Sequence, residues 1–122
     1  MTKITKQFGD EGEDIAVEHL LKKGYEIIER NYRFGKGEID IVAKDPQTGF
    51  TVFIEVKSKK NLEFGDPVYS VTKNKMKQIK RMAELYLYDK EIAVIDCRFD
   101  VITVLLRGNQ KPVIEHYVNA FM

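Results

Sequence analysis

A helical segment that stands between two groups of strand-like segments is the feature that most constrains the fold of this chain. Residues 72–88 place Met76, Ile79, Ala83 and Tyr86 at helical intervals, while most of the basic side chains lie off that stripe. A helix at this place lets the chain cross over and lay the next strand parallel to the previous one. We therefore predict an α/β fold in which a mixed β-sheet is flanked by helices.

Five segments carry the apolar alternation that is typical of strands. They are residues 25–33, 38–44, 50–59, 98–106 and a shorter one at 112–118. The turn signal "GKG" separates the first two, and "DPQTG" joins the second and third as a hairpin. A first helix is expected over residues 10–23, with Asp10 and Glu13 at capping-box spacing and Gly24 as its C-terminal stop. An exposed loop is expected at residues 60–67.

Length and composition indicate one globular domain over residues 1–122. The formal net charge is only +1, so nucleic-acid binding would have to rest on local clusters of positive charge. A single cysteine excludes an internal disulfide framework. The first residues lack the apolar core of a signal peptide, and no run approaches the roughly 18 apolar residues that a membrane helix needs. We expect a cytoplasmic protein that makes no membrane contact.

Two carboxylates and a lysine stand inside the most apolar strands. Because side chains alternate along a strand, Asp40 shares a face with Glu38 and Val42, opposite Ile39 and Ile41.

Glu55 and Lys57 share a face of the next strand, and the hairpin brings the centre of that strand beside Asp40. Two like charges this close repel one another, and partial burial enlarges that cost. A divalent cation is the usual remedy, and oxygen ligands suit Mg²⁺ or Mn²⁺. We therefore predict a metal site at Asp40 and Glu55, completed by the backbone carbonyl of Val56.

Lys57 and Glu13 extend this predicted site. Lys57 would hold a scissile phosphate or stabilise the attacking hydroxide. Glu13 has two interpretations that do not exclude each other. Its spacing from Ala16 and Val17 directs it along the buried stripe of the first helix, where it could reach the metal through a water. It could equally cap the start of that helix.

Basic and aromatic residues alternate before the hairpin, in the stretch "ERNYRFGK". This mixture can grip a nucleic-acid backbone while a ring stacks on an unpaired base, or it can be a solvated hairpin edge. The predicted nucleic-acid contacts are Arg30, Arg33, Lys36, Lys59 and Lys75. The lysine-rich face of the second helix could face phosphate or water. His19 and His116 lack metal-ligand spacing, and Arg98 and Asp100 are each expected to be part of a structural ion pair or a charge at a strand edge.

A strand with Asp followed by a Glu-x-Lys strand resembles the PD-(D/E)xK nuclease motif, with "EID" in the place of "PD" and "EVK" in that of "ExK". The motif belongs to the restriction-endonuclease-like fold, which archaeal Holliday-junction resolvases share. A closer likeness lies in the stretches "GDEGEDIAVEHLLKKGYEIIERNYRFGKGEIDIVAKD", "VFIEVKSKK", "VTKNKMKQIKRMAELYL", "RFDVITV" and "NAF". Through them, nearly the whole chain resembles the YraN-like uncharacterised family of bacterial proteins.

The resemblance implies a restriction-endonuclease-like mixed sheet of about five strands. It places the presumed catalytic set on Glu13, Asp40, Glu55 and Lys57, with Lys75 assisting at the phosphate. The implied function is a Mg²⁺- or Mn²⁺-dependent endonuclease that hydrolyses DNA, with branched or repair intermediates as substrates. A homodimer follows from the likeness to resolvases. Two alternatives remain open: a nucleic-acid-binding module without turnover, and a protein-interaction domain with an internal ion network.

Overall fold

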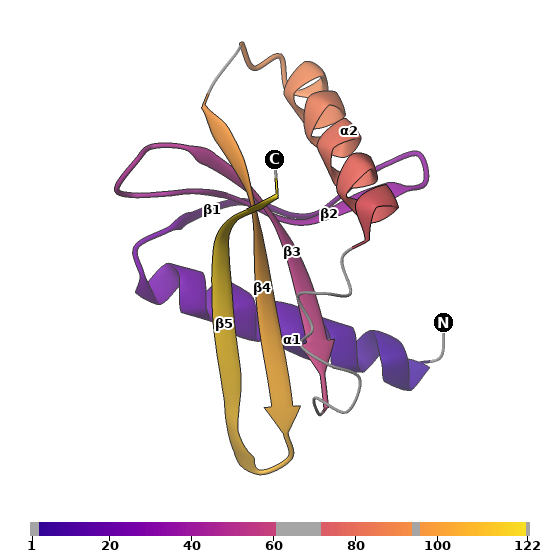
Figure 1. Ribbon diagram of the computed structural model, residues 1–122, viewed down its shortest axis with the longest axis vertical. Coiled ribbons are helices and arrows are strands. Elements are labelled where there is room, and N and C mark those ends of the chain that lie inside the picture. The colour runs from indigo at the N-terminus through magenta and orange to yellow at the C-terminus, as the bar shows by residue number, and fades with distance from the viewer. Residues whose placement is uncertain (1–2, 61–71, 94–95, 122) are drawn as a thin grey trace.

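All five predicted strands join one sheet in the computed structural model, which describes residues 3–60, 72–93 and 96–121, with side chains from Asp10 onward. The elements are α1 (Lys3–Lys22), β1 (Glu26–Phe34), β2 (Gly37–Lys44), β3 (Thr51–Lys59), α2 (Lys73–Asp89), β4 (Cys97–Arg107) and β5 (Gln110–Phe121). The strand order is β1-β2-β3-β4-β5 (Figure 1). Among these described strands only β3 and β4 pair in parallel, so the predicted mixed sheet and its crossover are confirmed.

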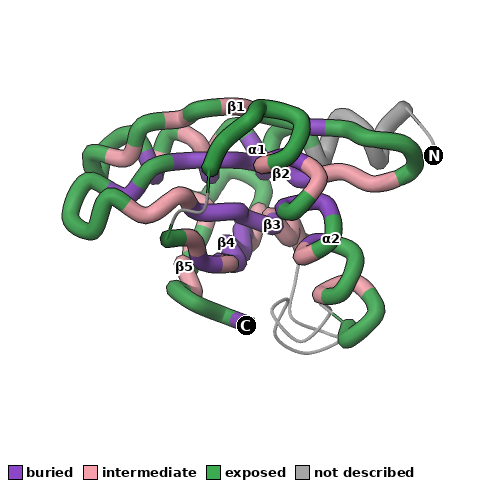
Figure 2. The backbone as a smooth tube through the Cα atoms, turned by 90° about the horizontal axis from the view of Figure 1, so that it is seen from above, coloured by how far each residue is buried: buried purple, intermediate pink, exposed green. Residues whose placement is uncertain are grey.

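The two helices cover opposite faces of the sheet. On β3, Val52 and Ile54 pack in a core cluster with Leu20 of α1, whereas Phe53 packs with Tyr86 of α2. This division follows from the alternation of side chains along a strand. Figure 2 shows the buried positions concentrated in β2, β3 and β4, with more exposure along the edge strands β1 and β5. The architecture is therefore a helix, sheet and helix sandwich, consistent with the predicted restriction-endonuclease-like fold.

The first helix begins earlier than its sequence suggests. It starts at Lys3, so Asp10 and Glu13 lie within it and the predicted capping box is wrong. The expected stop is confirmed, because Gly24 has φ of 87° and its N–H donates to the carbonyl of Leu21. The predicted loop at 60–67 lies almost wholly outside the described residues.

The second helix starts as expected. Thr72 has extended backbone angles, and its hydroxyl accepts a hydrogen bond from the N–H of Lys75. Its buried side chains are Ile79, Met82, Ala83 and Tyr86, so Met82 joins the predicted stripe. The fifth strand, at Gln110–Phe121, is longer than predicted because it pairs along most of β4.

A buried ion network fixes the end of the sheet where β4 begins. The guanidinium of Arg98 contacts Asp45 at 2.5 Å and Asp100 at 3.0 Å, so of the two expected roles the structure shows the ion pair. Asp100 is fully buried and also hydrogen-bonds His116 Nε2 and the N–H of Asn119. Burial alone would raise the pKa of Asp100, but the hydrogen bonds from His116 and Arg98 outweigh it and lower that pKa. The network is therefore fully paired, which suits a structural role.

Neither described helix is both long enough and apolar enough to cross a membrane.

Candidate active site

The strands β2 and β3 part at the position of the two predicted carboxylates. Their ladder ends at the pair Ile41 and Ile54, so Asp40 and Glu55 follow one residue further along. The backbone N–H of Val56 donates instead to Asp40 Oδ2, at 2.8 Å. A carboxylate thus takes the place of a ladder carbonyl, which keeps a backbone donor satisfied where the sheet opens. The structure brings Asp40 and Glu55 together, as the hairpin predicts.

The face assignment on β2 needs one correction. Ile39 packs with Phe53 on the α2 side, whereas Ile41 packs with Ile54 on the α1 side, so these two isoleucines do not share a face. On the neighbouring strand, Asn31 has φ of 53° between the residues that pair with Ile41 and Ile39. A left-handed residue in a strand breaks the simple alternation. Asp40 therefore lies at the point where β2 turns from one face to the other.

Burial and its neighbours make Asp40 a weak acid. Burial raises its pKa most, the charge of Glu55 adds to the rise, and the N–H of Val56 opposes it, with a resulting value of about 8. The negative charges of Glu13 and Glu38 raise the pKa further. The folded protein therefore disfavours the ionised form of Asp40.

Two lysines approach Glu55 from different elements. Lys57 Nζ lies 3.5 Å from Glu55 Oε1, and Lys75 Nζ of α2 lies 3.7 Å from the same oxygen. Glu55 is only 6% exposed, so these contacts are partly shielded from water. Glu55, Lys57 and Lys75 therefore meet on the α2 face of the sheet, as the alternation of β3 predicts.

Glu13 reaches the same region from the α1 side. It is 7% exposed, and its Oε1 lies 3.2 Å from both Nε and Nη2 of Arg30. Burial raises the pKa of Glu13, and Arg30 and Asn31 act against that rise. Gly12 allows this approach, because a Cβ there would lie 1.7 Å from Ser58 Oγ on β3. Asn31 is a site residue that the sequence does not announce, since its backbone angle and its hydrogen bond to Glu13 are visible only in the structure.

The residues present fit a magnesium or manganese ion. Nowhere in 3–60, 72–93 and 96–121 do three His, Cys, Asp or Glu side chains form a metal-binding group. Mg²⁺, however, is commonly held by one or two carboxylates, with waters and substrate phosphates as its other ligands. Asp40 and Glu55 supply such a pair of hard oxygen donors, and the raised pKa of Asp40 indicates a need for positive charge. Val56 donates its N–H to Asp40, and its carbonyl stays a proposed third ligand.

A family model described as "Uncharacterised protein family UPF0102" matches residues 12–104, which include all of these carboxylates. The chain belongs to this family. The predicted YraN-like membership is thereby confirmed. Relatives named "UPF0102 protein" agree over nearly their full length. The chain is 46% identical to that of Trichlorobacter lovleyi, over 98% of this chain and 93% of the relative. It is 49% identical to that of Chlorobaculum tepidum, over 93% of this chain and 91% of the relative.

The predicted nucleic-acid contacts of this UPF0102 chain differ in their exposure to solvent and in their ion pairs within the protein. Arg30 is held by Glu13 and also by Asp14, whose Oδ1 lies 2.6 Å from Nη2. Arg33 is exposed and lies 3.7 Å from Glu38, Lys36 is exposed, and Lys59 is half-buried. The arginine nearest the carboxylates is therefore engaged within the protein.

The two aromatic residues of the same stretch also differ. Tyr32 is buried, and its hydroxyl donates to Asp89 Oδ2 at 3.3 Å. Phe34, in contrast, is 49% exposed at the end of β1. Only Phe34 of this pair presents a ring to solvent.

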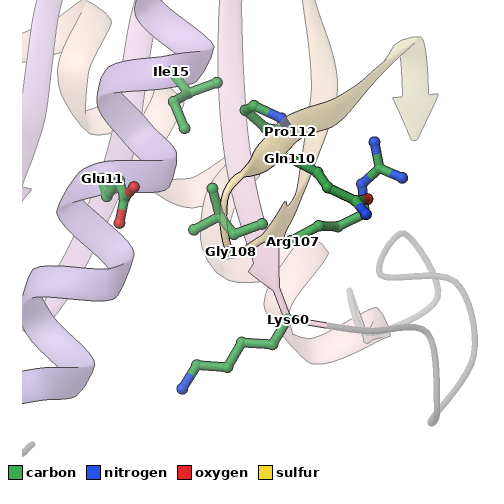
Figure 3. Close-up of a pocket in the computed structure, with 8 residues that line it drawn as sticks. Glu11, Ile15, Lys60, Arg107, Gly108, Gln110 and Pro112 are labelled. Carbon is green, nitrogen blue, oxygen red and sulfur yellow. The ribbon is translucent and has the colours of Figure 1, made fainter.

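A hollow of about 590 Å³ lies away from the carboxylates, between α1 and the turn that joins β4 and β5. Figure 3 shows Glu11 and Lys60 at its edges, with the guanidinium of Arg107 directed away. That guanidinium donates to the carbonyl of Lys111. The hollow shares no residue with the UPF0102 carboxylate site.

Proposed function

We propose that this UPF0102 protein is a divalent-cation-dependent endonuclease that hydrolyses phosphodiester bonds in DNA. The observation that carries the proposal is the juxtaposition of Asp40 and Glu55 in a shielded site, where burial first and the charge of Glu55 second raise the pKa of Asp40 to about 8. A fold that needed only stability would be served better by an uncharged residue there. A carboxyl group with a strongly raised pKa, with a lysine near its carboxylate neighbour, is typical of catalytic sites.

Each residue has a defined part in the proposal. Asp40 and Glu55 hold Mg²⁺ or Mn²⁺, and the bound ion supplies charge for the scissile phosphate and a lower pKa for water. Lys57 follows Glu55 on the same strand face and positions the phosphate or the attacking hydroxide. Lys75 contacts Glu55 from α2 and pairs with a neighbouring phosphate.

Glu13 and Arg30 are proposed to hold the site in place and not to contact the substrate. Their ion pair joins α1 to β1 beside Asp40, and Glu13 contributes to the electrostatic field that Asp40 experiences. Arg30 is assigned here to Glu13 and not to nucleic acid, because two carboxylates already hold its guanidinium. Branched and repair intermediates remain the proposed substrates.

A second function is favoured by two contacts. Lys57 and Lys75 both lie within ion-pair distance of Glu55, so the site could be an internal ion network in a DNA-binding module that lacks turnover. The module and the enzyme share the fold and the basic residues. They differ in whether the bond is cut.

A substrate panel separates the two functions. Purified protein is incubated with forked, four-way junction, single-stranded and duplex DNA, with Mg²⁺, Mn²⁺ or chelator. The enzyme is supported by cleavage that requires the cation and is lost in Asp40→Asn, with Asp10→Asn as the exposed control on α1. Binding to these DNAs without cleavage, and equal binding by Asp40→Asn, would support the module. Absence of binding even at low salt, where phosphate contacts are strongest, would exclude both.

A further inference from the structure

We propose that a hollow beside the candidate site binds an unpaired base of single-stranded DNA, with the ring of Phe34 as its stacking surface. The hollow lies between the turn of β1 and β2 and the helix α2, and has a volume of about 370 Å³. Its described lining residues are Phe34, Lys36, Gly37, Gln78, Arg81, Met82 and Leu85. This inference rests on the proposed nuclease function and names the form of DNA that the site receives.

The lining has the chemistry of a single-strand binding site. Such sites combine cations that track the phosphates with aromatic rings on which bases stack. Lys36 and Arg81 supply positive charge, and the described lining includes no carboxylate. The side chains of Met82 and Leu85 form an apolar wall, and the amide of Gln78 can both donate and accept hydrogen bonds. Because the chain as a whole carries only +1, this local excess of cations is a property of the hollow.

The helix α2 connects the hollow to the candidate site. Lys75 contacts Glu55, and Gln78 and Met82 follow it at intervals of three and four residues, on the same side of the helix. With a rise of about 1.5 Å per residue, Gln78 lies roughly 5 Å further along the helix axis, and Arg81 about 9 Å. The hollow therefore begins about one helical turn from the lysine at the carboxylates.

The strand β2 also connects the hollow to the candidate site. Asp40 is at the candidate site, and Gly37, three residues earlier on β2, lines the hollow. At about 3.4 Å per strand residue this separation is on the order of 10 Å, which is about three stacked nucleotides. Gly37 also lets β2 approach α2 closely, since a Cβ there would lie 2.2 Å from Met82 Sδ. A strand whose phosphate is at Lys57 could therefore place a nearby base against Phe34.

An unpaired base is the occupant that fits this surface. In a duplex both faces of each base are covered by neighbouring bases, so a protein ring can stack only on a base that has left the helix. Phe34 is the ring available for this contact, because Tyr32 is buried and bonded to Asp89. Single-stranded segments, or the unpaired bases of a branched intermediate, are therefore the expected ligands.

The test measures binding without cleavage. Fluorescence anisotropy is recorded for a single-stranded oligonucleotide and for a duplex of the same length, at low salt and in chelator. The proteins are wild type, Phe34→Ala, Phe34→Leu, and Tyr88→Ala as the control for another exposed ring, which is 86% exposed on α2. Removal of a ring on which a base stacks typically weakens affinity by about tenfold or more. Both Phe34 variants should weaken single-strand binding by about tenfold, and leave duplex binding within about twofold of wild type.

The outcomes distinguish this inference from the proposed function. Phe34→Ala that binds the single strand as tightly as wild type, or that weakens single strand and duplex equally, would overturn the stacking site and leave the nuclease proposal standing. A wild-type protein that binds neither DNA would overturn both. Selective loss in both Phe34 variants, with Tyr88→Ala unchanged, would support the stacking site even if no DNA is cut. Thermal melts confirm that each variant is folded.

Discussion

The carboxylate of Asp40 accepts a 2.8 Å hydrogen bond from the backbone N–H of Val56, one residue beyond Glu55, at the point where β2 and β3 part. This bond satisfies a donor that the opening of the sheet would otherwise leave unpaired. It also holds Asp40 beside Glu55, although their charges repel and Glu55 is buried. The position of Asp40 therefore has two effects. It satisfies the N–H of Val56, and it places two carboxylates where a cation would stabilise them.

The stability of the protein should depend on the ionisation of Asp40. Its pKa is about 8 in the folded protein against 3.8 ordinarily, so the folded state binds this proton more tightly. The Asp40 contribution to the free energy of unfolding should therefore fall as pH rises from about 4 to about 8. Asp40→Asn removes this titration while its amide oxygen can still accept from Val56. Its stability relative to wild type should rise by about 2 kcal/mol between pH 5 and 8.5, after a discount for partial exposure.

Urea denaturation in chelator at both pH values measures this difference. Asp10→Asn, at an exposed position of α1, is the control and should show no such trend. A stability difference between Asp40→Asn and wild type that stays constant with pH would show that Asp40 is ionised throughout this range.

Lys57 should matter for turnover more than for binding. Lys57→Met keeps an apolar chain of similar length but removes the ammonium that lies 3.5 Å from Glu55. Loss of one preorganised charge at a reacting phosphate typically costs about 100-fold or more in rate, whereas affinity for uncut DNA should change by less than about threefold. Rates come from single-turnover cleavage and affinities from anisotropy in chelator. Lys73→Met, at an exposed position of α2, is the control, and equal rates for the two variants would refute the role of Lys57.

Arg30 and Arg33 should have separable effects although they stand close in the sequence. Arg30→Met leaves buried Glu13 without its cation, so we expect a loss of stability of about 1–2 kcal/mol and little change in DNA affinity. Arg33→Met removes an exposed charge, so we expect little change in stability. The slope of log affinity for DNA against log salt concentration should fall by about the amount that one phosphate contact contributes. Denaturation and salt-titrated binding test both variants. The opposite assignment of effects would mean that Arg30 faces the nucleic acid.

The close approach of α1 to β3 should make Gly12 sensitive to a single methyl group. In an ordinary helix Gly→Ala stabilises by about 1 kcal/mol. Here the new Cβ would lie 1.7 Å from Ser58 Oγ and 2.9 Å from Ser58 Cβ, so Gly12→Ala should instead destabilise by about 2 kcal/mol or more. The double variant with Ser58→Gly should recover part of that loss. Denaturant unfolding measures each, and a Gly12→Ala protein as stable as wild type would show that the helix can move away freely.

The features that sequence predicts well are those set by local pattern. Alternation defines the strands, "DPQTG" closes the hairpin, and the helix at 72–88 permits the crossover that makes β3 and β4 parallel. The meeting of Asp40 and Glu55 follows from the same hairpin, because counting back from the turn places them opposite each other. Local chemistry is sufficient for all of these.

The features that sequence misses depend on contacts between distant segments. Arg30 belongs to a basic stretch, yet its partners Glu13 and Asp14 come from α1, so its inward role has no local signal. The change of face between Ile39 and Ile41 depends on the left-handed backbone of Asn31 on the neighbouring strand. The early start of α1 is missed for a related reason. Glycine disfavours helix, so the sequence does not indicate that Gly12 lies inside one. The packing of Gly12 against Ser58, which only the structure shows, explains why a glycine stands there.

The measurement that tests the central claim most directly is anomalous X-ray scattering from crystals soaked in Mn²⁺ at a pH above about 8, where Asp40 is ionised. The account predicts an anomalous peak in contact with the carboxylates of both Asp40 and Glu55, which disappears in Asp40→Asn crystals soaked in the same way. The absence of a peak in wild-type crystals, with the ammonium of Lys57 lying between the two carboxylates, would contradict it.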